Sequence, residues 1–487
     1  MLSASVSLAA QEPAQESKLD GVKQSPVAEK APAAEKKITL AERDELFKSV
    51  DDILQWVSKD TGLPIRSHVK RELSTRDEVQ KYVEERMAED EDQKRLERSE
   101  LVLKKFGLLP RDFKLRPFLI ALLKDQVAGF YDSKRKTVHM LDWIDSGSQK
   151  PVLAHELTHA LQDQSVDLDQ WVKDARAKAK KSPDRENAEI ELDEMISARA
   201  AMLEGQGMAV LVDYILEPQG RSLKDSPLLA EAMKVSMTTG QGSSVLDSAP
   251  LLLRESLVFP YRDGLGFVQA LLDSGGSKRA YGDALQQPPR NTRDILSPES
   301  YLQKQAVPEM KIPALEKSLG KAYEKYDIGS IGQFDIVLFS KQFSTNVDAR
   351  ELSSAWRGGF YYSALQKSAA KKPAPVTGDL AVLYLSRWSS PAMAQRFADV
   401  YARSFKIKYT NATQDSGKWK SEEGPLTVEV MGDRLLVMEG FDAETAAKLR
   451  TAVLGNQPAT EHKTARSGNL SLKTVAPVFA VRLMMRH

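Results

Sequence analysis

The segment His155-Glu156-Leu157-Thr158-His159 places two imidazoles and a carboxylate at a spacing that suits metal-assisted hydrolysis. Residues four apart lie on one face of a helix, so His155 and His159 can direct both imidazoles at one ion. Glu156 lies about 100° further round a helix of roughly 3.6 residues per turn. Its carboxylate can reach a water on the ion from there. The pattern therefore predicts a Zn²⁺ site in which Glu156 is the general base.

The sequence around this segment predicts a buried helix. Residues 151–164 have a helical pattern, and Pro151 suits the first turn. Two of the six histidines in the chain lie in this one segment. Apolar residues would carry the polar group into a core, where it needs a functional reason to be present; they are Val152, Leu153, Leu157, Ala160 and Leu161. The alternative is a surface helix with two solvated histidines.

A third metal ligand is expected from a carboxylate. A catalytic zinc site usually has three protein ligands and an open position, but the chain has no cysteine and no further histidine close downstream. Glu204 lies in an otherwise small or apolar stretch of a long helix expected over residues 184–216, and Gly205 and Gly207 follow it. Small residues let two helices approach closely, and two glycines inside a helix indicate a packing or functional requirement. The alternative is a core helix in which Arg199 satisfies Glu204.

Other polar residues near these segments are interpreted as lying outside the ligand set. Residues 185–194 hold most of the acidic side chains of the long helix and are typical of a solvated face, with Glu194 the next ligand to test after Glu204. Asp163 follows His159 by one helical turn, so it either orients that imidazole or is solvated at the helix end. His139 is expected on a strand surface and is left out of the site.

Hydrolysis also needs a hydrogen-bond donor for the negative charge that develops on the substrate oxygen. The best candidate is Tyr261, in a segment (259–264) whose proline and glycine predict a kink and a turn before a helix over 265–272. Arg262 is a weaker candidate. The alternative, that Phe259 and Tyr261 are core aromatics at a helix start, is about equally favoured.

The two motifs together, His155-Glu156-x-x-His159 and Glu204-Gly205-x-Gly207, resemble those of the gluzincin clan of zinc metallopeptidases, which are thermolysin-like in site design. The separation of His159 from Glu204 is longer than is usual there, and residues 167–184 are interpreted as an inserted loop. The chain looks closest to a group of uncharacterised bacterial exported proteins, over roughly residues 45–305. The blocks that carry this resemblance are 126–132, 155–164, 203–205, 259–264 and 288–298.

A hairpin is predicted immediately before the first motif. Residues 126–132 and 136–142 flank Ser133-Lys134-Arg135 in a strand–turn–strand pattern. The resemblance implies that a strand at the edge of the cleft binds a peptide substrate by strand addition. Residues 137–141 are the better candidate for that strand because of their β-branched content.

Composition limits the partners. The net charge of +1 gives no reason to expect a nucleic acid, and no stretch approaches the length of a transmembrane segment. The absence of cysteine excludes disulfides and thiol catalysis. Residues 1–10 are small and apolar and end like a signal-peptide cleavage region, so we expect an exported protein (periplasmic or extracellular) whose signal peptide is truncated in this sequence.

The expected fold is α+β, with a mainly helical zincin-like catalytic region, a small edge hairpin and a separate small α+β domain. Strands are predicted at 334–339, 380–385, 426–431 and 434–439, and helices at 349–355, 391–405 and 443–453. The expected division is a leader remnant and disordered linker (1–38), an N-terminal helical lobe (39–125), the catalytic domain (126–310), the small α+β domain (311–455) and a tail (456–487).

These observations predict a zinc-dependent metallopeptidase that acts on a peptide or protein substrate. His155, His159 and Glu204 hold Zn²⁺, Glu156 activates water, and Tyr261 is the candidate donor to the oxyanion. The alternative is a non-catalytic exported scaffold or binding protein with a structural or vestigial zinc site. The carboxylate of Glu156 argues against it, because a structural site needs no base.

Overall fold

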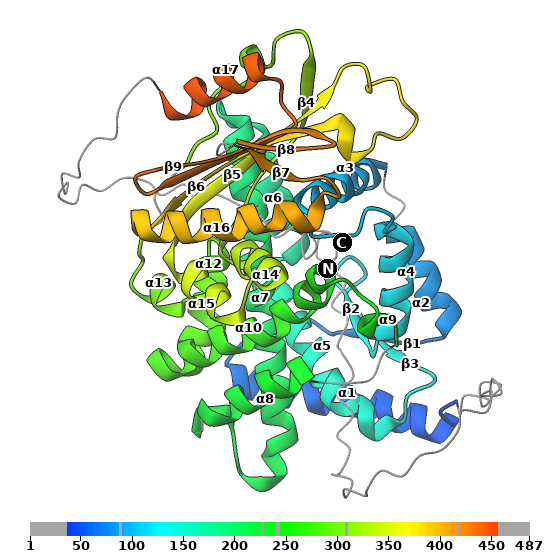
Figure 1. Cartoon of the computed structure of the whole chain (residues 1–487). Coiled ribbons are helices and arrows are strands. Elements are labelled where there is room, and N and C mark those ends of the chain that lie inside the picture. The colour runs from blue at the N-terminus through cyan, green and yellow to red at the C-terminus, as the bar shows by residue number, and fades with distance from the viewer. Residues whose placement is uncertain are drawn as a thin grey trace, which may run out of the picture.

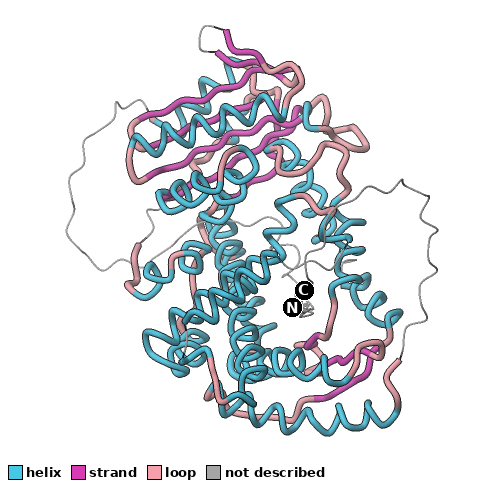
Figure 2. Tube along the Cα trace, turned by 60° about the horizontal axis from the view of Figure 1, so that its bottom comes forward, coloured by secondary structure: helices cyan, strands magenta, loops and turns pink. Residues whose placement is uncertain are grey.

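The computed structural model describes residues 37–86, 90–225, 227–239, 244–306, 310–415 and 418–455 (Figure 1). Helices form the N-terminal part and a large antiparallel sheet with its own helices forms the C-terminal part (Figure 2). The expected leader and linker, except for Lys37 and Ile38, and the expected tail lie outside the described residues. Among the helices that are described, none is long and apolar enough to span a membrane. The α+β prediction is confirmed.

The helical part begins with α1 because Thr39 and Glu42 form a capping box at its start. Its apolar residues recur at helical spacing and are buried from Leu46 to Val57. The helices of this part are α1 (Leu40–Thr61), α2 (Arg76–Arg86), α3 (Asp90–Phe106), α4 (Leu115–Gln126), α5 (Ser146–Val166), α6 (Leu168–Lys180), α7 (Arg185–Leu216), α8 (Pro227–Thr239), α9 (Ser244–Asp247), α10 (Leu251–Ser277), α11 (Ala284–Gln286), α12 (Thr292–Leu296) and α13 (Pro298–Leu302).

A three-stranded sheet lies beside the helices in the order β1 (Lys70–Ser74), β3 (Thr137–Leu141), β2 (Phe130–Asp132). The predicted hairpin is present, since β2 and β3 are antiparallel. The expectation that 137–141 is the edge strand is wrong, because β1 pairs with its other side in parallel. β1 was not expected, since it is a five-residue strand within a stretch whose pattern is otherwise helical.

Two further corrections concern the helices around the site. Residues 167–184 are not a loop, because most of them form α6, which begins at an Asp167 cap that accepts from Gln170 N. The segment 259–264 is not a turn, because it lies inside α10, with Pro260 in the helix interior. In α10, Gly264 provides a close helix contact instead of a turn.

The C-terminal part is a seven-stranded sheet in the order β4-β5-β6-β10-β9-β8-β7, antiparallel at every pairing. Helices α14 and α16 lie on one face and α17 on the other (Figure 1). Its elements are β4 (Tyr323–Ser330), α14 (Gln333–Phe343), α15 (Asn346–Ala355), β5 (Trp356–Gln366), β6 (Leu380–Trp388), α16 (Pro391–Lys408), β7 (Thr413–Asp415), β8 (Lys418–Ser421), β9 (Gly424–Met431), β10 (Arg434–Glu439) and α17 (Ala443–Leu454).

The predicted strands at 380–385, 426–431 and 434–439 are confirmed, as are the three predicted helices. The strand predicted at 334–339 is wrong, because these residues lie in α14. A short apolar run does not distinguish a strand from a buried helix. Here Asp335 accepts a hydrogen bond from Gly332 N at 2.8 Å, which starts the helix.

The helical part and the sheet part share one continuous apolar core. Phe106 at the end of α3 meets Tyr361 of β5 edge-on at 5.8 Å between ring centroids, and Phe259 of α10 lies 4.2 Å from Phe334 of α14. The buried Lys105 of α3 also pairs with Glu423. The C-terminal part therefore packs through its helix α14 against α10, which is one of the helices at the site.

Candidate metal centre

Helix α5 carries the first motif and buries it. The helix begins at the Asp145 cap, whose side chain accepts from Ser148 N, so Pro151 lies in the helix interior, a turn later than expected. His155 is 0% exposed and His159 3%. Their rings lie nearly perpendicular, with centroids 4.8 Å apart. The prediction of a buried helix with both imidazoles on one face is confirmed.

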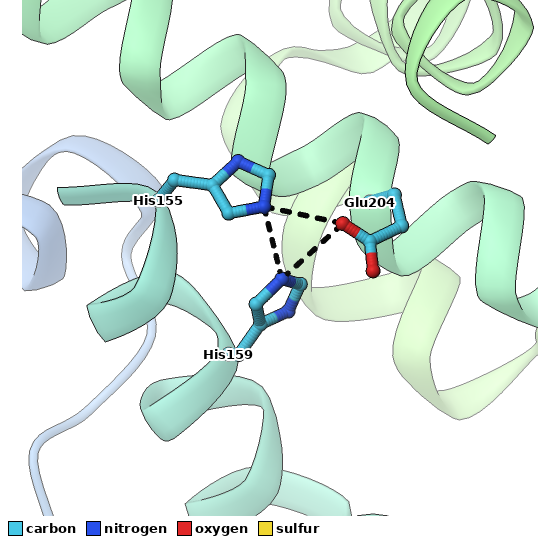
Figure 3. A group of neighbouring side chains, drawn as sticks. All are labelled: His155, His159 and Glu204. Atoms are coloured by element: carbon cyan, nitrogen blue, oxygen red, sulfur yellow. Dashed lines mark hydrogen bonds and ion pairs between the residues drawn. The ribbon is translucent and has the colours of Figure 1, made fainter. Parts of the chain in front are cut away.

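Helix α7 brings Glu204 to the two imidazoles (Figure 3). Oε2 of Glu204 lies 3.1 Å from Nε2 of His155 and 3.5 Å from Nε2 of His159. The two Nε2 atoms are 3.1 Å apart. Two ligands each about 2.1 Å from a tetrahedral zinc are roughly 3.4 Å apart. The three side chains therefore fit a divalent metal such as zinc, through two nitrogens and one oxygen.

The glycines of the second motif have separate structural reasons. A Cβ on Gly205 would overlap the main chain of Gly264, so Gly205 permits α7 and α10 to cross closely. A Cβ on Gly207 would lie 2.7 Å from both Nδ1 and Cε1 of His155. Gly207 thus makes room for the imidazole of His155, one of the candidate ligands. The prediction that these glycines serve close packing is confirmed.

Charge within the triad favours a cation. Burial acts to lower the pKa of His159, but the charge of Glu204 and a hydrogen bond to it raise this pKa to about 9. Burial acts to raise the pKa of Glu204, but His159 and the hydrogen bonds from both imidazoles lower it to about 2. Near neutral pH the triad without metal is therefore a carboxylate paired with an imidazolium. A divalent metal can take the place of that proton.

Glu156 follows His155 on α5 and is 1% exposed. Its Cγ lies 3.8 Å from the position that a Cβ on Gly129 would occupy, so the residue that precedes β2 packs against it. The hairpin therefore borders Glu156 at the residue before β2.

Tyr261 lies beside the triad, with its ring centroid 6.3 Å from that of His155 and the two planes 29° apart. Tyr261 therefore lies next to one of the candidate ligands. Arg262 points its charge elsewhere: it pairs with Asp263 at 2.7 Å and with Glu255 at 3.0 Å. These two carboxylates neutralise the guanidinium, so Arg262 remains the weaker candidate.

Three polar residues lie differently from expectation. Asp163 does not orient His159; it accepts from Tyr131, Lys136 and the main chain of Leu168. Glu194 is not on a solvated face; it is 0% exposed and accepts from Thr292 N at 2.6 Å. Because of this anchoring, Glu194 lies apart from the triad. Arg199 does not satisfy Glu204 and stacks over Trp171 at 4.0 Å.

His139 lies in the small sheet rather than in the triad. Its ring stacks on Phe130 at 4.3 Å between centroids, and its Nδ1 is 3.0 Å from Ser74 Oγ. Leaving His139 out of the ligand set agrees with this placement. It is buried, however, and not on a strand surface.

Two residues of the site were not expected. Gln162 contacts His159 and Gln206 contacts Gln162, and both side chains are completely buried. The only available signal was a pair of amides in otherwise apolar helical stretches. A separate pocket of about 460 Å³ lies at the C-terminal end of α5, lined by residues 66–69 and 163–167 with Tyr131 and Lys136. Its lining includes none of the three candidate ligands.

Comparison with known proteins describes the C-terminal part. A family model described as a domain of unknown function (DUF8575) matches residues 317–450, which hold the seven-stranded sheet and its helices. No curated protein and no solved structure matches the chain. The triad lies outside the matched residues.

Proposed function

We propose that this chain is a zinc-dependent metallopeptidase. The observation that carries the proposal is the convergence of His155, His159 and Glu204 in one buried group, with Glu156 adjacent on the same helix as the two histidines. Two imidazoles, one carboxylate and a neighbouring glutamate form the donor set and base of catalytic zinc sites that hydrolyse peptides.

The side chains divide the work as follows. His155, His159 and Glu204 hold the metal, which when bound acidifies a water and polarises the substrate carbonyl. Glu156 takes the proton of the attacking water and then delivers it to the amine that leaves. A carboxylate can do both because it is a base while ionised and becomes an acid once it has accepted the proton.

Tyr261 is the proposed donor to the oxyanion. Its ring lies beside His155, on a helix that crosses α7 next to the ligand Glu204. A phenol hydroxyl remains protonated at neutral pH and can donate to developing negative charge on the substrate oxygen. Packing of α14 against α10 supports the helix on which Tyr261 lies.

The test combines metal content with turnover. Wild-type protein should retain one zinc per chain after dialysis, and Glu204→Ala should lose it. A fluorogenic peptide library, which samples many cleavage sites at once, supplies the substrate. Glu156→Gln should keep zinc while hydrolysis falls by roughly 10²–10⁴-fold, the usual contribution of a general base. Glu189→Gln, on the exposed start of α7, is the matched control and should remain active.

Two results would contradict the proposal. A Glu156→Gln variant with full activity would show that Glu156 is not the general base. A folded wild-type chain without zinc would remove the site.

A second function is a non-catalytic binding protein that uses zinc as structural support. The burial of the triad favours it, since the side chains of His155, His159 and Glu204 are only 0%, 4% and 8% exposed. Cobalt substitution separates the two functions. A four-coordinate spectrum that added azide or acetate does not change indicates a closed structural site, whereas a spectrum that responds indicates an open position.

A further inference from the structure

Two buried glutamines connect His159 to the main chain of a third helix. Nδ1 of His159 lies 2.8 Å from Oε1 of Gln162, on the same helix. Nε2 of Gln162 donates to Oε1 of Gln206 on α7 at 2.8 Å. Nε2 of Gln206 in turn donates to the carbonyl of Ala280 at 2.6 Å. The chain of bonds therefore spans α5, α7 and the segment that follows α10.

Main-chain carbonyls determine the direction of every bond in this chain. A carbonyl oxygen only accepts, so the group of Gln206 that faces Ala280 must be its NH₂. Gln162 Nε2 also donates to the carbonyl of Leu203, at 3.1 Å, which determines the orientation of the second amide. The oxygen of Gln162 is then left to face His159, and Nδ1 of that imidazole must be the donor.

We propose that Gln162 and Gln206 are positioning residues that select the metal-binding tautomer of His159. This inference rests on the metal site proposed above. When a metal replaces the proton on Nε2, an imidazole that donates from Nδ1 keeps its lone pair on Nε2, the atom that faces Glu204. The hydrogen bonds that run from His159 through Gln162 and Gln206 to the Ala280 carbonyl form a relay. This relay fixes both the orientation of the His159 ring and the nitrogen that carries its proton. Groups that orient metal-bound imidazoles in this way strengthen metal binding.

The other imidazole is held differently. Among the described residues, Nδ1 of His155 has no hydrogen-bond partner. Packing holds this ring, because Gly207, which has no side chain, lies directly against it. The relay therefore acts on His159 and not on His155.

The Ala280 carbonyl that ends the relay belongs to a π-helical segment, Lys278–Asp283, and such segments are rare and often lie at functional sites.

The test compares two substitutions that both remove the NH₂ of Gln162. Gln162→Leu also removes the acceptor for Nδ1 of His159, whereas Gln162→Glu keeps an acceptor. The zinc Kd, measured by competition with a chromogenic chelator, should rise about 10–100-fold in Gln162→Leu. In Gln162→Glu it should stay within roughly threefold of wild type, because a carboxylate accepts the same hydrogen bond. With cobalt bound in place of zinc, the visible absorption spectrum of Gln162→Leu should differ from that of wild type, whereas the spectrum of Gln162→Glu should match it.

The controls separate positioning from packing. Gln269→Leu removes a buried glutamine of α10 that donates to the Leu223 carbonyl, and should leave the zinc Kd unchanged. Gln206→Leu should raise the zinc Kd only about threefold, since Leu203 still orients Gln162. If Gln162→Leu does not fold, Gln206→Leu measured against Gln269→Leu decides the question.

Equal zinc Kd values for folded Gln162→Leu and Gln162→Glu would overturn the relay and leave the metal site standing. Equal values for Gln206→Leu and Gln269→Leu would overturn the part assigned to Gln206. A folded wild-type chain that binds neither zinc nor cobalt would overturn the metal site and the relay together.

Discussion

Substituting Gly207 by alanine should separate metal binding from folding. A Cβ at this position would lie 2.7 Å from Nδ1 and Cε1 of His155 and 3.0 Å from Nε2. Ordinary contacts between carbon atoms are about 3.5–4.0 Å. The imidazole must therefore move by roughly 1 Å, whereas metal–ligand distances tolerate only about 0.2 Å. His155 should no longer act as a ligand.

The expected effect on zinc is large and the expected effect on the fold is small. Altering a group that only orients a ligand lowers metal affinity roughly 10–100-fold, so losing His155 should lower it more than about 100-fold. This corresponds to more than about 2.7 kcal/mol. Replacing a helical glycine by alanine stabilises a helix by about 1 kcal/mol, while crowding a core costs about 1–3 kcal/mol. The metal-free stability of Gly207→Ala should thus remain within about 2 kcal/mol of wild type.

The assay is the zinc Kd by chelator competition, with urea unfolding of the metal-free protein measured in parallel. Gly282→Ala is the matched control, because a Cβ there meets nothing within 4 Å. It should bind zinc like wild type. Gly205→Ala is the opposite case, since its Cβ would overlap the main chain of Gly264 and should destabilise the fold.

A Gly207→Ala protein that folds and binds zinc with the wild-type Kd would refute this reasoning. It would mean that His155 is not a ligand, or that its ring is not held against α7. A variant that unfolds like Gly205→Ala would show that Gly207 serves helix packing rather than the imidazole.

Three further predictions concern charge. Because the pKa of His159 is raised to about 9, this imidazole holds a proton near neutral pH that zinc must displace; the zinc affinity should fall about tenfold for each unit of pH lowered between pH 8 and 6. Burial and Asp335 raise the pKa of Glu194 well above 4.5, so the folded state binds this proton more tightly than the unfolded state. The unfolding free energy of wild type should therefore decrease as pH rises above about 4.5, and should decrease less in Glu194→Gln. Lys408 and Glu439 are a buried ion pair with side chains 1% exposed; Lys408→Met should cost about 3–5 kcal/mol in urea unfolding.

Each of these has a contrary result. A zinc affinity that does not change between pH 6 and 8 would mean that His159 is already neutral. Identical pH profiles for wild type and Glu194→Gln in urea unfolding would mean that Glu194 titrates normally. For the ion pair, the control is Lys448→Met, which removes an exposed partner of Glu444 and should lower the free energy of unfolding by less than about 1 kcal/mol. If Lys408→Met lowered the free energy of unfolding by the same amount, burial of the Lys408–Glu439 pair would not matter for stability.

The candidate ligands could be predicted because their signal is local. His155 and His159 lie four residues apart, and helical geometry alone places them together. Glu204 was recognisable as the one carboxylate in a stretch of mostly small and apolar residues, where burial of a charge needs a reason. Glu194 was misjudged by the same approach, because its neighbours are acidic while the element that buries it, residue 292 onward, is distant in sequence.

The fold was predicted where the residue pattern repeats over several turns or alternates clearly. The strands β6, β9 and β10 and the long helix α7 belong to this group. Residues 334–339 were assigned to the wrong element because six residues of mixed apolar character suit a strand and a buried helix alike. The pairing of β1 with β3 joins strands separated by more than sixty residues and has no local signature.

By itself, the sequence determined which groups can do chemistry: two imidazoles and a glutamate on one helix, and one buried carboxylate on another. Spacing along a helix is a local property, and the burial of a charge is costly enough to leave a trace in composition. Only the tertiary structure decided how these groups are held. Three contacts between segments far apart in sequence hold them: Gly205 lets α7 approach α10, Gly207 leaves space for the His155 ring, and the amide relay joins His159 to Ala280. Such contacts depend on how helices pack against one another, which no periodicity within a single helix specifies.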